Sequence, residues 1–369
     1  MRPSYRPDID GLRAISAGSV VLFHAHVPGF RGGFVGVDIF FVISGYLITQ
    51  VLLASAELAP RQWLAEFYIR RCRRVLPALF ALLLLVTPIA ALVLMPGDLR
   101  SHGRYLASTS VLLTNVAAWT DHRSGWPALI HLWTISVEEQ FYLVFPLLLL
   151  AAWRARAIAP ALLIGGLAAL SFALSVWASY AAPGASFYLT PPRAWELLLG
   201  ALLVLAPVKI SSAIARQTLA IASLLVIAVS VHLYSNRTPY AGFYALPVCL
   251  AAATLLVTGG ERTTLVARLL ATRPLVFTGL ISYSLYLWHA AILSLFTSWN
   301  RGAPDTLQTV VLLAAIWALA VLSWRVIEQP VRRRTWFKSD RRFLIAAVTL
   351  NLVFGAAGII LWKVRPSAP

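Results

Sequence analysis

Two ionisable side chains stand in the first apolar run of the chain. The stretch "RAISAGSVVLFH" begins at Arg13 and ends at His24. A separation of eleven residues is close to three helical turns, so both side chains share one helix face, about 16 Å apart along its axis. An ionisable group inside a bilayer is by default a functional-site hypothesis. His24 is therefore interpreted as a general base, and the alternative is a neutral imidazole that is hydrogen-bonded between helices.

A carboxylate in the second apolar run could orient that imidazole. The stretch "GGFVGVDIFFVISGYLIT" places Asp38 about one helical turn inside its boundary. Because the connection from the first run is short, the two helices are expected to be antiparallel neighbours, with Asp38 and His24 at similar depth. A carboxylate behind an imidazole fixes its tautomer and supports its use as a base. A purely structural His–Asp pair is the alternative.

Four arginines gather where the third apolar run begins, in "FYIRRCRRVLPAL". Arg71 and Arg74 lie three positions apart and share a helix face, and so do Arg70 and Arg73. Paired guanidinium groups suit the phosphates of a nucleotide-bearing donor. A positively charged anchor at the cytoplasmic surface is the alternative.

Two later stretches supply candidates for a substrate cavity. In "PPRAWELLLG", Arg193 and Glu196 are one turn apart on one face, which predicts either cavity-lining groups or an ion pair inside the membrane. In "ISYSLYLWH", Tyr286 and His289 fall near one helix face, with His289 deep in its run. A structural histidine is the alternative there.

These residues must be positioned by membrane helices. The chain is 59% hydrophobic and only 12% charged, and apolar runs of membrane-spanning length recur throughout. The net charge of +17 gathers in short loops, which indicates the positive-inside rule and argues against nucleic acid as a partner. Cys72 and Cys249 show no metal-ligand spacing, so neither a disulfide framework nor a metal is expected.

The sequence predicts an all-α polytopic bundle. Twelve apolar segments are visible, but the loops rich in Lys and Arg alternate correctly only if one segment fails to span. The weakest is residues 105–119, a short, hydroxyl-rich run that we expect to be a re-entrant or non-spanning helix. The expectation is about eleven spans, with the N-terminus in the cytoplasm and the C-terminus outside.

Seven stretches, taken in order, resemble the integral-membrane acyltransferase-3 family, bacterial O-acetyltransferases of surface polysaccharides. They run from residue 5 to residue 334 and are "YRPDIDGLRAISAGSVVLFHA", "GGFVGVDIFFVISGYLIT", "FYIRRCRRVLPAL", "HLWTISVEEQFYLVFPLLLL", "PPRAWELLLG", "ISYSLYLWH" and "IEQPVRRR". The resemblance implies transfer of an acyl group, usually acetyl, from cytoplasmic acetyl-CoA to a sugar hydroxyl on the far side of the membrane. It implies a bacterial plasma (inner) membrane protein whose partners are acyl-CoA, a glycan or lipid-linked saccharide and the bilayer.

The resemblance also assigns residues. The family's Arg-x10-His pattern falls on Arg13 and His24. Its Arg-x-x-Arg pattern falls on Arg71 and Arg74, with Arg70 and Arg73 as a competing register. Arg13, Arg71 and Arg74 are therefore expected to bind the acyl-CoA donor. Its glutamate in Trp-x-x-x-Val-Glu matches Glu138, which is expected to contact the acceptor or support His24. A helix-start carboxylate favoured by the helix dipole is the alternative for Glu138.

The expected organisation is a membrane acyltransferase domain over residues 1–335. Residues 336–369 follow as a cytoplasmic linker, a final span and a short extracytoplasmic tail. Many longer relatives carry an esterase-like domain after the last span, and this form is expected to lack it, so a separate periplasmic protein is a possible partner. The alternative function is a secondary transporter or flippase for a glycan-linked substrate, which would need no acyl-CoA. A second alternative is a non-enzymatic assembly partner for an envelope synthase, which would show neither coenzyme A binding nor turnover.

Overall fold

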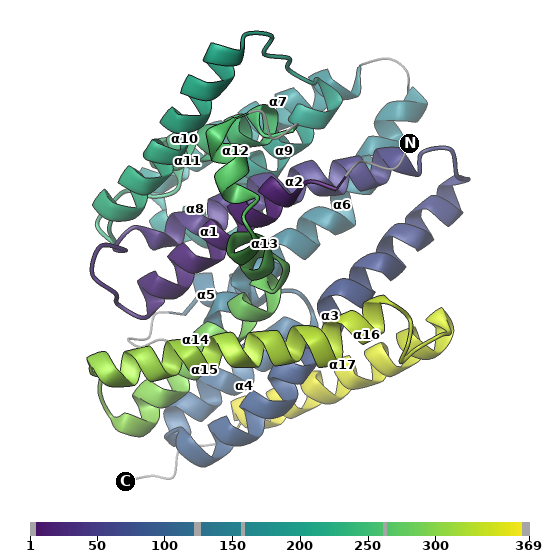
Figure 1. Cartoon of the computed structure of the whole chain (residues 1–369). Helices are drawn as coiled ribbons and strands as arrows, with labels where there is room; N and C mark the ends of the chain where they lie inside the picture. Colours follow the sequence, from purple (N-terminus) through teal and green to yellow (C-terminus); the bar gives the residue numbers. More distant parts are fainter. Residues whose placement is uncertain (1–4, 122–126, 156–158, 261–263, 364–369) are drawn as a thin grey trace. The chain divides into compact units, whose positions relative to one another are not determined.

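The structure is a computed structural model that describes residues 5–121, 127–155, 159–260 and 264–363. Within these ranges the chain is helical and contains no strand, which confirms the predicted all-α class (Figure 1). The helices are α1 Pro7–His24, α2 Gly36–Ala54, α3 Pro60–Val93, α4 Pro96–Ser110, α5 Thr114–Trp119, α6 Trp133–Ala155, α7 Pro160–Ala181, α8 Pro183–Tyr188, α9 Thr190–Leu205, α10 Ala213–Leu233, α11 Gly242–Thr258, α12 Leu265–Leu270, α13 Arg273–Leu280, α14 Ser282–Asn300, α15 Thr306–Ser323, α16 Gln329–Arg332 and α17 Asp340–Lys363. The short helical turns are η1 Gly33–Val35, η2 Ile130–Leu132 and η3 Trp324–Glu328.

Seven helical segments in the described part of the chain are long and apolar enough to cross a membrane. They contain α2, α3, α6, α7, α10, α15 and α17. The pair α13 and α14 makes an eighth if its two parts, bent by 67°, form one span. This confirms a multi-pass helical membrane protein, but it does not reach the expected eleven spans. The helices left over are short or charged: α9 has 16 residues, α11 has 17, and the 18 residues of α1 include Asp8, Asp10 and Arg13.

The segment over residues 105–119 is not one helix. It consists of the end of α4, a break at residues 111–113 where Leu112 has a φ of 58°, and α5. Hydroxyl groups satisfy the interrupted backbone: Thr109 donates to the Tyr105 carbonyl at 2.7 Å, and the Ser136 hydroxyl accepts from the Thr114 N–H at 3.2 Å. Neither α4 nor α5 is among the candidate spans, and the polar side chains that weakened this segment in the sequence hold its break together.

The first helix, α1, starts at Pro7, six residues before Arg13, and ends at His24. Proline at the first position suits a helix start, because its missing N–H would have no partner there. His24 is thus the last helical residue of α1, and not a residue in the middle of a longer helix. Arg13 and His24 do belong to one helix, so their separation of about 16 Å holds.

The described chain packs into two compact units, which are considered separately. Unit 1 comprises residues 1–64 and 137–282, and unit 2 comprises residues 65–136 and 283–369. The predicted domain boundary after residue 335 follows neither division and stays a prediction. The expected tail after Lys363 lies outside the described residues.

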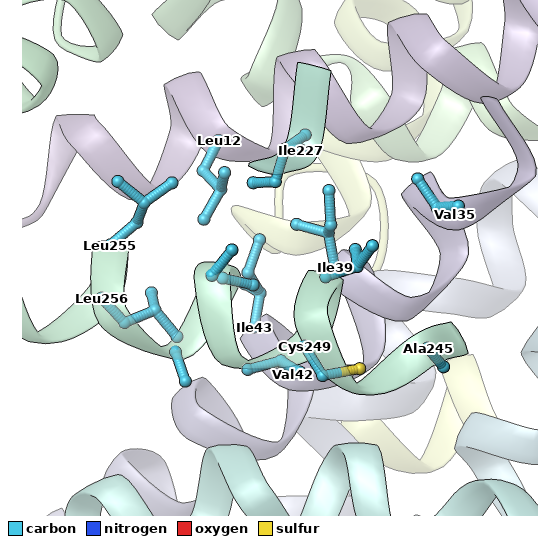
Figure 2. Close-up of a cluster of buried hydrophobic side chains, with 14 of the residues drawn as sticks. Leu12, Val35, Ile39, Val42, Ile43, Ile227, Ala245, Cys249, Leu255 and Leu256 are labelled. Atoms are coloured by element: carbon cyan, nitrogen blue, oxygen red, sulfur yellow. The ribbon is translucent and has the colours of Figure 1, made fainter. Parts of the chain in front are cut away.

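A continuous apolar core holds unit 1 together. Side chains from α1, α2, α10 and α11 meet in it, among them Leu12, Ile39, Val42, Ile227 and Leu255 (Figure 2). Each of these five side chains is at most 4% exposed. Burial of this kind fixes α2 against its neighbours, and α2 carries Asp38.

Two glycines let α2 and α9 lie almost backbone to backbone. A Cβ on Gly45 would lie 1.8 Å from the Leu197 carbonyl oxygen, and one on Gly200 would lie 2.0 Å from the Val42 carbonyl oxygen. Small residues at such crossings are the usual way that membrane helices approach closely. The contact brings the acidic residue of α2 within reach of the charged residues of α9.

In unit 2, α4 and α17 run side by side (Figure 1). A Cβ on Gly103 would lie 2.5 Å from the Trp362 backbone nitrogen, and one on Gly358 would lie 2.4 Å from the Ala107 nitrogen. The Asn351 side chain donates to the Ser110 carbonyl at 2.8 Å, at the end of α4. The last helix is therefore an integral part of unit 2.

Candidate active site

The predicted site residues divide between the two units. Unit 1 holds those of α1, α2, α6 and α9: Arg13, His24, Asp38, Glu138, Arg193 and Glu196. Unit 2 holds those of α3 and α14: Arg71, Arg74, Tyr286 and His289.

On α1, the charge of Arg13 is paired locally. Its Nη1 lies 3.2 Å from Oδ1 of Asp10, one turn earlier, and Tyr5 donates to Oδ2 of Asp10 at 2.8 Å. His24, at the other end of the helix, is half-buried, and its ring centroid lies 4.9 Å from that of Phe23.

Asp38, Arg193 and Glu196 form a buried ionic triad. Nη1 of Arg193 lies 3.1 Å from Oδ1 of Asp38 and 3.1 Å from Oε1 of Glu196. All three side chains are at most 1% exposed. The predicted Arg193–Glu196 ion pair is confirmed, and the carboxylate expected behind His24 has an arginine as its ion-pair partner. The orientation of His24 by Asp38 stays a prediction.

The triad also bears on metal binding. Ligand atoms of Asp38, Glu196 and Cys249 lie within 4.8 Å of one another, a spacing that a metal ion could use. However, Arg193 already supplies a positive charge to both carboxylates. Its guanidinium also lies 5.4 Å from the centroid of the Phe41 ring, in the range of a cation–π contact. The chemistry of this group is that of a buried, arginine-centred ion network.

Aromatic rings connect the triad to the end of α1. The Tyr240 ring centroid lies 6.0 Å from the Arg193 guanidinium carbon and 4.9 Å from the ring centroid of Phe34. Phe34 in turn lies 5.6 Å from Phe23, the neighbour of His24. Burial, followed by the negative charge of Asp38, raises the pKa of the Tyr240 phenol well above its usual value. Tyr240 is therefore a neutral hydroxyl, and the sequence analysis did not identify it.

Glu138 contacts the same helix that carries Asp38. It is half-buried in the second turn of α6 and accepts a hydrogen bond of 2.8 Å from the Ser44 hydroxyl on α2. Ser44 is six positions beyond Asp38, about 9 Å along the helix axis. Glu138, on α6, therefore contacts α2 about 1.7 turns beyond Asp38.

In unit 2, the structure distinguishes the two arginine pairs of α3. Arg73 is 3% exposed, pairs with Asp340 at 2.9 Å and donates to the carbonyls of Val331 and Phe337. Arg70 is exposed and pairs with Glu66 one turn earlier. Both are engaged within unit 2. Arg71 and Arg74, the other pair, are half-buried. Their donor contact stays a prediction.

His289 belongs to a buried cluster with Tyr286 and His131. The ring centroids of the two histidines lie 5.5 Å apart, and that of Tyr286 lies 5.3 Å from that of His289. The Tyr286 hydroxyl donates to the His131 carbonyl and lies 2.7 Å from the Thr134 hydroxyl. The sequence analysis missed His131, although it opens the quoted stretch "HLWTISVEEQ". A histidine directly before a membrane helix was the available signal.

The comparisons with known proteins identify the family. The family model of the acyltransferase-3 type, described as an acyltransferase domain, matches residues 6–325. The chain belongs to this family, as its motifs indicated.

The similar proteins are longer than this chain. It is 30% identical to the peptidoglycan O-acetyltransferase OatA of Listeria monocytogenes, over 92% of this chain and 59% of the relative. It is 29% identical to the O-acetyltransferase OatA of Staphylococcus aureus, over 90% of this chain and 58% of the relative. A putative peptidoglycan O-acetyltransferase of Bacillus subtilis, YrhL, is 31% identical over 92% of this chain and 57% of the relative. The chain thus spans somewhat more than half the length of these relatives. No solved structure matches it.

Proposed function

We propose that the protein is a transmembrane O-acyltransferase that moves an acetyl group from cytoplasmic acetyl-CoA to a hydroxyl of an extracytoplasmic glycan. Membership of the acyltransferase-3 family and the printed function of the three relatives support the reaction class. The observation that carries the assignment to residues is the placement of His24. His24 is half-buried and is the last residue of α1. Arg13 lies about 16 Å away along the same helix, toward its N-terminal end.

The proposed reaction is a direct transfer. The glycan hydroxyl attacks the thioester carbonyl carbon, an ester C–O bond forms, and the C–S bond breaks. His24 accepts the proton of the attacking hydroxyl and returns it to the departing thiolate, so that coenzyme A leaves as the thiol. General-base assistance of this kind contributes roughly 10²- to 10⁴-fold. Acylation of His24 itself, before transfer to the glycan, is the variant of this route.

The donor and acceptor are proposed to approach from opposite sides. Arg71 and Arg74 would hold the phosphate end of coenzyme A, because paired guanidinium groups bind phosphate oxygens well. The proposed topology has eleven crossings: the seven candidate spans, the bent α13–α14 pair, and α1, α9 and α11. The N-terminus is then cytoplasmic and the protein lies in a bacterial plasma membrane.

That topology can be tested with single cysteines. In a background without Cys72 and Cys249, cysteines replacing Ser211 and Asn236 flank α10 at its two ends. A membrane-impermeant maleimide added to intact cells or spheroplasts should label the cysteine at 236 and not the one at 211. The reverse pattern would overturn the topology.

The function is tested by supplying the donor to one face only. Sealed inverted vesicles, which expose the cytoplasmic face, receive acetyl-CoA labelled in the acetyl group. We expect label in glycan or lipid-linked material inside them, and none when sealed right-side-out vesicles receive the same donor. A transporter would give no donor-dependent label. Equal labelling in both orientations would refute transfer across the membrane.

A further inference from the structure

A pocket of about 660 Å³ opens beside His24 in unit 1. Its lining comes from the end of α1 with the connection to η1, and from the connection between α10 and α11. Phe23 and His26, which flank His24 in the sequence, both line it. The volume lies in the range of small-molecule sites.

The first loop is held against the end of α10 by main-chain contacts. The Gly32 N–H donates to the Val231 carbonyl at 2.8 Å, and a Cβ on Gly32 would lie 2.2 Å from the Ser230 carbonyl oxygen. Within the second loop, the Ser235 N–H donates to the Thr238 hydroxyl at 3.1 Å. These contacts fix the positions of the two loops that line the pocket.

The lining combines aromatic rings with positive charge. Phe23 and Phe30 are half-buried, whereas Arg31 and Arg237 are exposed. None of the residues that line the pocket is acidic, and neither guanidinium has an ion-pair partner in the part of the chain that the structure describes. Arginine prefers planar anionic groups, and aromatic rings offer apolar faces to the C–H faces of sugars.

We propose that this pocket binds the glycan acceptor, and that Arg31 and Arg237 select a glycan that carries an acidic group. This inference rests on the proposed function, since it places the acceptor beside His24 on the extracytoplasmic side. The contact between the Phe23 and His24 rings, with centroids 4.9 Å apart, joins the pocket wall to the proposed base. The acidic group is a sugar carboxylate or a phosphate of a lipid-linked precursor.

Binding to the purified full chain in lipid nanodiscs tests the charge selectivity. The probes are a disaccharide of N-acetylglucosamine and N-acetylmuramic acid, which carries a carboxylate, and chitobiose, its neutral counterpart. The double variant Arg31→Gln/Arg237→Gln is compared with wild type and with Arg301→Gln, an exposed arginine of another loop. We expect the wild type and Arg301→Gln to prefer the acidic disaccharide by about tenfold or more, and the double variant to lose that preference.

A third ligand separates the two sources of negative charge. N-acetylglucosamine 1-phosphate carries a phosphate, and tighter binding of this ligand than of the acidic disaccharide would assign the pocket to the phosphate of a lipid-linked precursor. The reverse order would assign it to a carboxylate. Equal affinity of the acidic and neutral disaccharides for wild type, or the same preference in the double variant, would overturn the proposal.

Acetyl transfer measured on the same proteins separates this inference from the proposed function. If wild type transfers acetyl groups and the double variant binds the acidic and neutral disaccharides with wild-type affinities, the pocket inference fails and the function stands. If wild type transfers nothing but prefers the acidic sugar through the two arginines, the function fails and charge-selective binding stands.

Discussion

The guanidinium of Arg193, on α9, lies 3.1 Å from the carboxylate of Asp38, on α2, and both side chains are removed from solvent. The same nitrogen lies 3.1 Å from Glu196. One arginine thus serves two buried carboxylates from helices that two glycines bring into close contact.

Removal of the shared arginine should destabilise the protein more than removal of either acid. Arg193→Gln leaves two buried carboxylates without a counter-charge, and breaking a buried pair in this way costs about 3–5 kcal/mol. Glu196→Gln leaves one carboxylate paired with one guanidinium, so its cost should be smaller, about 1–3 kcal/mol. Thermal unfolding of the detergent-purified chain should rank wild type above Glu196→Gln and Glu196→Gln above Arg193→Gln. Unfolding of Arg193→Gln at the wild-type temperature would refute a stabilising triad.

The sequence predicts one of the two ion pairs in this triad, Arg193–Glu196, and not the other, Arg193–Asp38. Arg193 and Glu196 are one turn apart on one helix, so their pairing follows from local geometry. Asp38 lies on a helix far away in the chain, and its pairing depends on how α2 and α9 pack. Pattern and spacing suggested His24 as its partner, because the connection between α1 and α2 is short. Long-range helix contacts of this kind are not encoded in periodicity.

The positions of the membrane helices were more predictable from the sequence than the breaks, bends and long-range contacts within them. Apolar runs located the membrane helices because a bilayer imposes length and composition on each span. The break at Leu112 and the bend between α13 and α14 were not visible in the apolar pattern. At the break, hydroxyl groups bond to the backbone, and those of Thr109 and Ser136 are examples. In the cluster of His131, Tyr286 and His289, the sequence identified only the two residues of α14. These two share a helix face, whereas His131 comes from a distant part of the chain.

Because α2 packs closely on α9, Gly→Ala substitutions at their contact should lower stability, whereas the same substitution at an open position should not. Gly45→Ala and Gly200→Ala would each place a Cβ within about 2 Å of a carbonyl oxygen of the opposite helix, so both should lower the unfolding temperature and acetyl transfer. Gly166→Ala is the control, because its Cβ would meet nothing within 4 Å. That variant should be neutral or more stable by up to about 1 kcal/mol, since alanine favours a helix. Equal melting temperatures for all three would contradict the close contact.

The arginines of α3 should separate into donor-binding and structural groups. The double variant Arg71→Gln/Arg74→Gln should weaken coenzyme A binding by about tenfold or more, because each charge-assisted hydrogen bond contributes about 1.5–3 kcal/mol. Arg70→Gln, which removes only an exposed pair with Glu66, should bind coenzyme A as wild type does. Isothermal titration with coenzyme A makes the comparison.

Arg73→Gln should act through stability, because it removes the contacts of Arg73 with Asp340 and two carbonyls. Its melting temperature should fall below that of Arg70→Gln. The assignment would be wrong if the Arg71→Gln/Arg74→Gln variant kept wild-type affinity for coenzyme A.

The hydroxyl of Tyr286 should matter to unit 2. Tyr286→Phe leaves the buried His131 carbonyl and Thr134 hydroxyl without this partner, which should cost about 1–3 kcal/mol. Tyr180→Phe changes a side chain that is 65% exposed and should leave the unfolding temperature unchanged. If the two variants melted together with wild type, the hydrogen bonds of Tyr286 would contribute nothing measurable to stability.

The role of His24 is the central claim, and one comparison tests it most directly. Sealed inverted vesicles containing wild type, His24→Ala or His232→Ala, at matched levels of folded protein, receive acetyl-CoA labelled in the acetyl group. His232 is exposed in the last turn of α10 and serves as the histidine control. We expect His24→Ala to lose 10²- to 10⁴-fold in the rate of label transfer to glycan, within the range of a lost general base, and His232→Ala to match wild type. Transfer by His24→Ala at the wild-type rate would contradict a chemical role for His24.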